Sequence, residues 1–308
     1  MISHVLPAYG VTACDRIWID KQAGRRGERL RLDYQLNKTM NKLDRDYISL
    51  AYMAMNGTPK QTRNGSVRCT FGHQIRHNMR EGFPLLTTKK VAFKTMCTEL
   101  TWFLRGETTL KYLHEHGCHI WDDDAKKHGS DDLGLIYGHQ WRGWSAGDRY
   151  IDQMQGIINA LKHNPDSRRM IVSAWNVGDL DYMALPPCHF AFQVQTEIIE
   201  GKRTLNLMWH QRSVDLPLGL PFNIASYGLL LLILAKEVDM VPGLLIGSLG
   251  DVHVYDNQTY GLLTQIKRDP YKLPTVSFEH KQFDHYLPDD FILEGYEHHP
   301  AIKFPLST

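Results

Sequence analysis

The sequence is poor in cysteine. Its 308 residues include five cysteines, an odd number spread along the chain as Cys14, Cys69, Cys97, Cys118 and Cys188. This distribution fits neither a disulfide framework nor a CxxC metal motif. A small disulfide-stapled secreted domain is therefore excluded, and each thiol has to be considered separately.

The 16 histidines give only weak metal signals. His114 and His116 are close in sequence, as are His298 and His299, but no HExxH motif and no compact Cys/His set accompanies them. We therefore expect the protein to bind no metal.

The sequence also lacks an excess of charge of one sign. Its 35 Lys and Arg residues balance 34 Asp and Glu residues, which argues against nucleic acid or an anionic membrane as a partner. The longest apolar run, Gly228 to Ala235, is far shorter than the ~18 residues that span a bilayer, and Met1 begins no signal-peptide pattern. We expect a cytoplasmic globular protein of enzyme size.

The first 46 residues differ in character from the rest. Residues 20–31 are dense in charge and glycine, and residues 32–46 are polar with scattered leucines. No internal repeat or low-complexity segment is present. We interpret residues 1–46 as an N-terminal extension whose role the sequence does not reveal, and residues 47–308 as one domain.

Hydrophobic spacing predicts both helices and strands after residue 47. Apolar residues three and four apart predict helices at 93–104 and 151–161, and the apolar stretch 224–238 predicts a buried central helix. Strands are predicted at 170–174, 190–196, 204–210 and 249–255. A hairpin break is expected at 200–202. The fold class that follows is α+β, a mostly antiparallel sheet with packed helices.

Cys188 is the first candidate for chemistry. Pro186 and Pro187 fix the backbone just before the thiol, and His189 follows it. A thiolate is an effective nucleophile when a neighbouring positive charge lowers its pKa. The alternative is a buried structural cysteine. The diproline and the polar segments below favour the nucleophile.

Two basic segments are suited to bind a phosphate. Arg168 and Arg169 follow a turn and lead into a strand, while Gln211-Arg212-Ser213-Val214-Asp215 joins a guanidinium to a hydroxyl. Such groups match the oxygens of a phosphate. Each segment alone is better explained as a solvated charge or a surface ion pair. The two segments together, around one candidate nucleophile, favour a phosphate site.

Three further features each allow two interpretations. Asn223 opens the expected central helix, where it could cap the helix or read a carbonyl and a ring N–H of a ligand. Glu99 lies among apolar neighbours, as either an exposed carboxylate or an acid/base of raised pKa. The aromatic segments 119–122 and 137–141 could stack a planar ligand or pack in the core.

Taken together, these segments resemble the thymidylate synthase family. The motifs that carry the resemblance are PPCH at 186–189, QRSVD at 211–215, LGLPFNIASY at 218–227 and GDVHVY at 250–255. Similarity begins near Ala51 and reaches Thr308, so the extension lies outside it. The resemblance implies that family's α+β fold, a homodimer formed through a sheet face, dUMP as substrate and 5,10-methylenetetrahydrofolate as co-substrate.

The resemblance also implies a role for each matching residue. Cys188 would attack C6 of the pyrimidine, and the other expected catalytic residues are Glu99, Tyr137, His189 and Arg212. The residues expected to bind dUMP are Arg63, Arg168, Arg169, Gln211, Arg212, Ser213, Asp215, Asn223, His253 and Tyr255. The second subunit would donate Arg168 and Arg169 to the 5′-phosphate. The residues expected to contact the folate are Trp121, Asp215, Gly219 and Phe222.

The resemblance leaves the product open. Reductive methylation would give dTMP and dihydrofolate, whereas water addition would give 5-hydroxymethyl-dUMP and intact tetrahydrofolate. Asparagine at 223 favours uracil over cytosine. The chain departs from the usual synthase in its polar end, Ser307-Thr308, in Ala92 where many members have histidine, and in Asp124 where some have tryptophan.

We favour methylation because Trp121, expected to shield the intermediate, is present. Hydroxymethylation is the alternative, and the polar end and added extension would suit a bacteriophage product. A nucleotide- or RNA-binding relative without activity is the third interpretation, against which the nearly neutral charge and the intact nucleophile motif argue.

Overall fold

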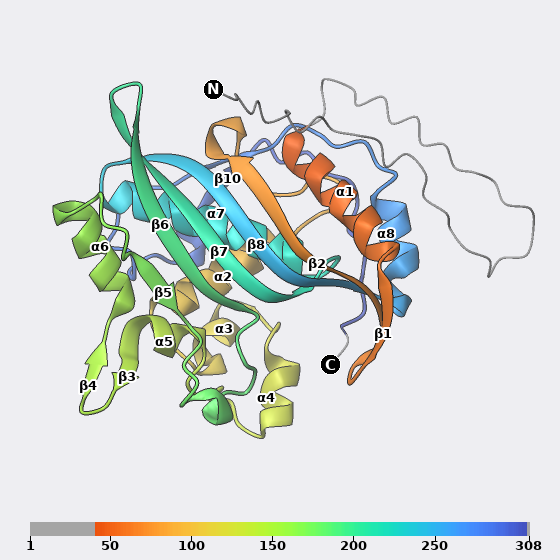
Figure 1. The fold of residues 1–308 in the computed structure, drawn as a ribbon, viewed down its shortest axis with the longest axis horizontal. Helices are drawn as coiled ribbons and strands as arrows, with labels where there is room; N and C mark the ends of the chain where they lie inside the picture. The colour runs from red at the N-terminus through yellow and green to blue at the C-terminus, as the bar shows by residue number, and fades with distance from the viewer. Residues whose placement is uncertain (1–40, 307–308) are drawn as a thin grey trace, which may run out of the picture. The chain divides into compact units, whose positions relative to one another are not determined.

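The computed structural model describes residues 41–306, and the expected extension up to residue 40 lies outside them. The main sheet is built from β1 (Thr58–Thr62), β2 (Gly65–Asn78), β5 (Ile171–Ser173), β6 (His189–Ile199), β7 (Lys202–Asp215) and β8 (Val241–Tyr255). Two small sheets pair β3 (Trp144–Ala146) with β4 (Arg149–Ile151) and β9 (Thr275–Ser277) with β10 (Ile292–Glu294). The main sheet has the order β1-β2-β8-β7-β6-β5 (Figure 1).

The helices of the described part cover a wide range of lengths. They are α1 (Lys42–Met55), α2 (Phe93–Leu104), α3 (Leu110–Glu115), α4 (Asp122–His128), α5 (Tyr137–Gly143), α6 (Gln153–His163), α7 (Gly219–Glu237) and α8 (Thr259–Gln265). The helices predicted around 93–104, 151–161 and 224–238 are thus confirmed as α2, α6 and α7. The four predicted strands are confirmed as β5 to β8.

The predicted α+β class with a mostly antiparallel sheet is confirmed. Every neighbouring pair in the main sheet is antiparallel except β7 and β8, which run parallel and are joined by α7. The expected hairpin break joins β6 to β7. Its turn residues Glu200 and Gly201 both have positive φ, +52° and +75°, as a two-residue turn with the twist of the flanking strands requires.

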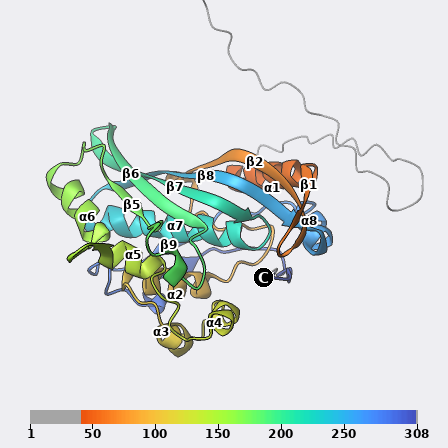
Figure 2. The ribbon, with the colours of Figure 1, turned by 60° about the horizontal axis from the view of Figure 1, so that its bottom comes forward.

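Helix α7 is the central element of the core. By length and composition it is apolar enough to cross a membrane, but 72% of its apolar window is buried inside the fold. Figures 1 and 2 show it running along one face of the sheet, behind and then beneath β6, β7 and β8. Its apolar side chains therefore face protein nearly all round, which confirms the predicted buried helix.

Helix α1 begins ahead of the expected boundary between residues 46 and 47. Within it, Asp44 is fully buried and its carboxylate accepts hydrogen bonds from the backbone N–H and hydroxyl of both Thr87 and Thr88, at 2.8–3.4 Å. Asn41 donates a further one at 2.8 Å. The helix is therefore fastened to the segment that precedes α2, and residues 41–46 belong to the described fold.

We expect Asp44→Ala to lower the free energy of unfolding by about 3 kcal/mol, because it leaves several buried donors without an acceptor. Asp46→Ala is the matched control on the same helix. That carboxylate makes only a partly exposed ion pair with Lys42, so its loss should cost less than about 1 kcal/mol. Urea unfolding of both variants tests this, and equal losses would contradict it.

Candidate active site

Four segments that are far apart in the sequence meet where the central strands of the main sheet begin or end. Cys188 directly precedes β6, and β6 pairs antiparallel with β7, so the start of β6 lies beside the end of β7. Since β8 runs parallel to β7, its last residues end at the same edge, with Asp215 beside His253. Helix α7 begins shortly after β7. The topology therefore collects most of the candidate residues.

Arg212 fixes the backbone that carries the candidate nucleophile. Its Nε donates to the Pro187 carbonyl and its Nη2 to the Pro186 carbonyl, both at 2.9 Å. Its backbone N–H donates to the Cys188 carbonyl, also at 2.9 Å. The guanidinium also lies 5.2 Å from the centre of the Trp175 ring. One side chain thus clamps the diproline turn and places a positive charge near the thiol.

The electrostatics of Cys188 balance two opposing effects. Burial raises the pKa of the Cys188 thiol, the Arg212 guanidinium lowers it, and the carboxylates of Asp124 and Asp215 raise it. The net direction is upward, opposite to the lowered pKa expected from a positive neighbour. Desolvation of the thiol is the largest effect, and the charge of the exposed Arg212 guanidinium only partly offsets it.

Tyr137 and His189 form a buried layer next to the nucleophile. The Cys188 backbone N–H donates to the Tyr137 hydroxyl at 2.8 Å, and the Tyr137 ring stacks on His189 with centroids 4.3 Å apart. His189 Nδ1 lies 2.9 Å from the Tyr227 hydroxyl. Burial lowers the pKa of His189 to about 3, so this imidazole is neutral at pH 7.

Glu99 is buried, so the interpretation of this residue as an exposed carboxylate is wrong. Only 7% of it is accessible, and the Trp121 indole N–H donates to its Oε1 at 2.8 Å. Burial raises the pKa of Glu99 to about 7, with the indole hydrogen bond acting in the opposite direction. A carboxyl group with this pKa can both donate and accept a proton near neutral pH.

Asn223 does not cap the central helix. Helix α7 begins at Gly219 with Leu218 at the N-cap, so Asn223 lies inside the helix and the capping interpretation is wrong. Its Oδ1 accepts a hydrogen bond from Gln211 Nε2 at 3.0 Å. Gln211 is itself buried and accepts from the Trp209 indole at 3.1 Å. The amide of Asn223 is therefore held in one orientation, with its NH₂ group available for a ligand.

Asp215 is the junction of the site with the C-terminal segment. It accepts from the Leu218 backbone N–H at 3.1 Å and from Gln258 Nε2 at 3.0 Å. Gln258 also donates to the Pro305 carbonyl at 3.2 Å. Burial raises the pKa of Asp215, and the Gln258 hydrogen bond acts against this. Gly219 and Phe222, which we expect to contact the folate, lie in the first turn of α7.

The other residues expected to bind dUMP lie at or near the ends of β7 and β8. Val67 of β2 pairs with Tyr255, and Arg63 lies in the turn between β1 and β2. Burial raises the pKa of Tyr255, whereas the Arg63 guanidinium, among other neighbours, lowers it. His253 Nδ1 lies 3.2 Å from Asp251 Oδ1. Ser213 is half-buried on β7 and pairs with Asp251.

Arg168 and Arg169 are the exception to this gathering. They lie on the turn between α6 and β5 and are exposed, and neither guanidinium has an ion pair or hydrogen bond to any residue of the range 41–306. The single chain leaves both groups free to reach another molecule.

The structure adds residues that the sequence analysis did not assign to the site. The Lys89 ammonium is buried, donates to the Pro217 carbonyl and lies 4.6 Å from the centre of the Phe304 ring. Burial lowers the pKa of Lys89 to about 8, against the attraction of Asp215. No motif in the sequence marks this lysine. The sequence did contain a signal for Tyr227, because this residue carries a polar hydroxyl group on a helix that was predicted to be buried.

This arrangement brings together a thiol on a clamped turn, a buried carboxyl group and an amide of fixed orientation. The family model described as thymidylate synthase matches residues 46–308. The chain therefore belongs to the thymidylate synthase family, as the resemblance predicted, and the match begins slightly before Ala51. The family transfers one carbon to dUMP with methylenetetrahydrofolate as co-substrate, so the chain is a methyltransferase-type enzyme.

We expect Glu99→Gln to change the pH dependence of stability. Because its folded pKa is about 7 against 4.5 for the free group, the folded state holds a proton that the unfolded state loses between these values. Glu99 therefore lowers the stability of the wild type as pH rises through this window, by at most about 3 kcal/mol. Glutamine has no proton to lose and should remove this fall.

Urea unfolding at about pH 5 and about pH 8 tests this expectation. The variant should gain stability relative to the wild type at the higher pH and little at the lower one. Glu115→Gln, at an exposed position of α3, is the control and should give the same small offset at both. A Glu99→Gln offset that does not change with pH would contradict the buried acid.

Proposed function

We propose that the protein methylates dUMP reductively to dTMP, through a covalent bond between Cys188 and C6 of the base. The observation that carries the proposal is the Arg212 clamp on the Pro186 and Pro187 carbonyls, which fixes the thiol and brings a positive charge to it. Addition of the thiolate to C6 makes C5 nucleophilic, so one hard step becomes two easier ones.

Methylenetetrahydrofolate would supply the carbon that joins C5 and then the hydride that completes the methyl group, leaving as dihydrofolate. Trp121 and Phe222 would contact it, and Asp215, tied through Gln258 to the Pro305 carbonyl, would connect it to the C-terminal segment. The C5 proton is lost as the folate nitrogen leaves the transferred carbon, which gives an exocyclic methylene intermediate. After this methylene accepts the hydride, the Cys188 sulfur leaves C6 and the product is released.

The fixed amide of Asn223 supports uracil as the base. Because its Oδ1 accepts from Gln211 at 3.0 Å, its NH₂ group is directed as a donor toward O4, which uracil has and cytosine replaces with an amino group. Its oxygen retains a second lone pair for the N3–H. Gln211, predicted to bind substrate, would act here by orienting Asn223.

Glu99 would move protons around the base. Its pKa of about 7 suits transfer to and from O4 and an ordered water, and Trp121 holds it in place. The neutral His189, the Tyr137 hydroxyl and the Tyr227 hydroxyl would complete this network.

One observation favours hydroxymethylation as the second candidate. Asp124 of α4 is half-buried, and its charge is near enough to Cys188 to raise the pKa of the thiol. Burial also raises the pKa of Asp124 itself. A carboxylate at this position could direct water to the methylene intermediate in place of hydride, which would give 5-hydroxymethyl-dUMP.

Incubation with dUMP and methylenetetrahydrofolate tests both candidates. We expect dihydrofolate absorbance to rise in step with a nucleotide heavier by one methylene unit. Cys188→Ser should abolish turnover, because the covalent route requires the thiol. A product that has one more oxygen than dTMP, formed without dihydrofolate, would show that the reaction is hydroxymethylation and not methylation. Equal turnover of dCMP would contradict the assignment of uracil.

We also propose that the protein acts as a homodimer through the open face of its sheet. Among the described elements, no helix is drawn across the face turned to the viewer in Figure 1. The strand register places one row across this face: Ile171, Gln193, Met208, Ile246 and Arg76. Half-exposed apolar side chains in such a row favour a protein partner. The dimer would bring the free Arg168 and Arg169 to the partner's phosphate site.

Mixing two inactive variants tests the shared site. A dimer of one Cys188→Ser and one Arg168→Ala subunit has one pocket with both defects and one with neither. A random mixture should therefore regain about one quarter of wild-type activity, since half of its dimers are mixed. Lys162→Ala, on the neighbouring helix α6, is the control for Arg168→Ala. This variant should be active by itself, without mixing. No recovery would contradict the donated arginines.

A further inference from the structure

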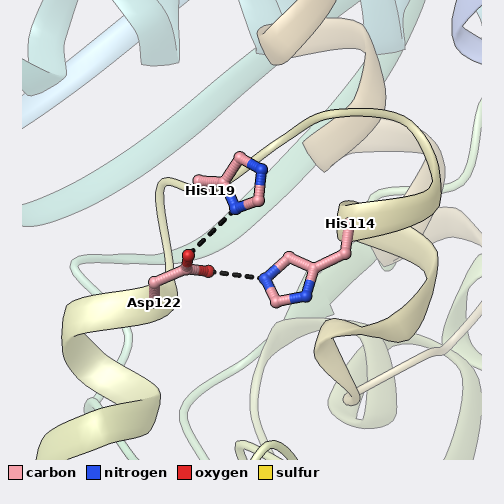
Figure 3. A group of neighbouring side chains, drawn as sticks. All are labelled: His114, His119 and Asp122. Atoms are coloured by element: carbon pink, nitrogen blue, oxygen red, sulfur yellow. Dashed lines mark hydrogen bonds and ion pairs between the residues drawn. The ribbon is translucent and has the colours of Figure 1, made fainter.

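A cluster of three metal-ligating side chains lies on the segment that joins α3 to α4. His114 is in α3, His119 follows in the connecting segment, and Asp122 opens α4. Figure 3 shows both imidazoles directed at the same carboxylate, one at each oxygen. His114 Nε2 lies 2.7 Å from Asp122 Oδ1, and His119 Nδ1 lies 2.9 Å from Oδ2.

The spacing of the donor atoms suits one small ion. One atom from each residue lies within 4.8 Å of the others. A transition-metal ion about 2.0–2.2 Å from nitrogen and oxygen ligands would replace the two imidazole–carboxylate hydrogen bonds, with each imidazole nitrogen moving slightly away from the carboxylate oxygen it now contacts. Two imidazoles and a carboxylate favour zinc and related ions over magnesium or calcium, which prefer an all-oxygen shell.

The cluster is open to solvent on one side. The side chains of His114 and Asp122 are 42% and 43% exposed, and that of His119 is 64% exposed. His114 and Asp122 also border a surface pocket of about 490 Å³, with Ser130 and Asp131 on its wall. An ion held by three protein groups would therefore have room for water at its remaining position, as in open zinc sites.

We propose that His114, His119 and Asp122 bind one zinc-type transition-metal ion. This proposal departs from the expectation of no metal, which considered His114 together with His116 and not with His119 or Asp122. In the structure His116 Nδ1 is instead bonded to the Tyr112 carbonyl at 2.9 Å. The proposal does not depend on the nucleotide reaction, since none of the three residues was assigned to it.

The ion would stiffen the part of the chain that carries Trp121. This residue lies between His119 and Asp122 in sequence, and its indole donates to Glu99 at 2.8 Å. Fixing the residues on both sides of Trp121 to one ion would restrict the segment from which that hydrogen bond is made. Protection of backbone amides in 114–122 from hydrogen exchange would report this directly.

Titration with Zn²⁺ alone, followed by calorimetry, tests the site in the full chain. We expect one ion per chain in the wild type, with affinity at least about tenfold weaker in His119→Ala and in Asp122→Asn. His128→Ala removes a histidine from the end of α4, outside the cluster, and should bind as the wild type does. Zn²⁺ should slow hydrogen exchange in 114–122 in the wild type and not in Asp122→Asn.

Two results would overturn the proposal. Zn²⁺ that binds equally well to His119→Ala and Asp122→Asn but is lost in Cys188→Ser would belong to the thiol. An absence of stoichiometric binding to the wild type would leave the cluster as a His–Asp–His hydrogen-bonded group. Neither result would bear on dUMP turnover, so failure of the metal site is distinguishable from failure of the proposed reaction.

Discussion

The parallel pairing of β7 with β8 is the constraint on which the site depends. Two parallel neighbours need a crossover, and here α7 supplies it and fills the core beneath the sheet. Because both strands run in the same direction, Asp215 and His253 lie side by side near the ends of their strands. The first turn of α7 begins at the same end of the sheet. The antiparallel β6 starts there as well, which brings Cys188 to Arg212.

Burial then sets the chemical character of the groups collected at this edge. Desolvation disfavours charge, so the pKa of Glu99 rises to about 7, that of His189 falls to about 3 and that of the Cys188 thiol rises. Only Arg212 among these neighbours favours the thiolate. In the proposed reaction, bound nucleotide would add its own charge and hydrogen bonds to this balance and so change the pKa of each group.

Local patterns were sufficient for the helices and strands that form this frame. The apolar spacing around Glu99 predicts α2, and the turn residues Glu200 and Gly201 predict the β6–β7 hairpin, because these signals act over a few neighbouring residues. They could not decide where the partner is distant. Local sequence left Asn223 either a helix cap or a ligand-reading amide. In the structure the chain turns into α7 earlier, at Gly219, and the Asn223 amide is held by Gln211 on β7.

The sequence by itself determined the fold class, the family motifs and the identity of the candidate nucleophile, since residue types and short spacings carry that information. Only the tertiary structure decided that Glu99 is buried against Trp121, that Arg212 is exposed and clamps the diproline, and that His114 meets His119 and Asp122. Burial and charge proximity depend on contacts between segments, and no periodicity within one segment encodes them.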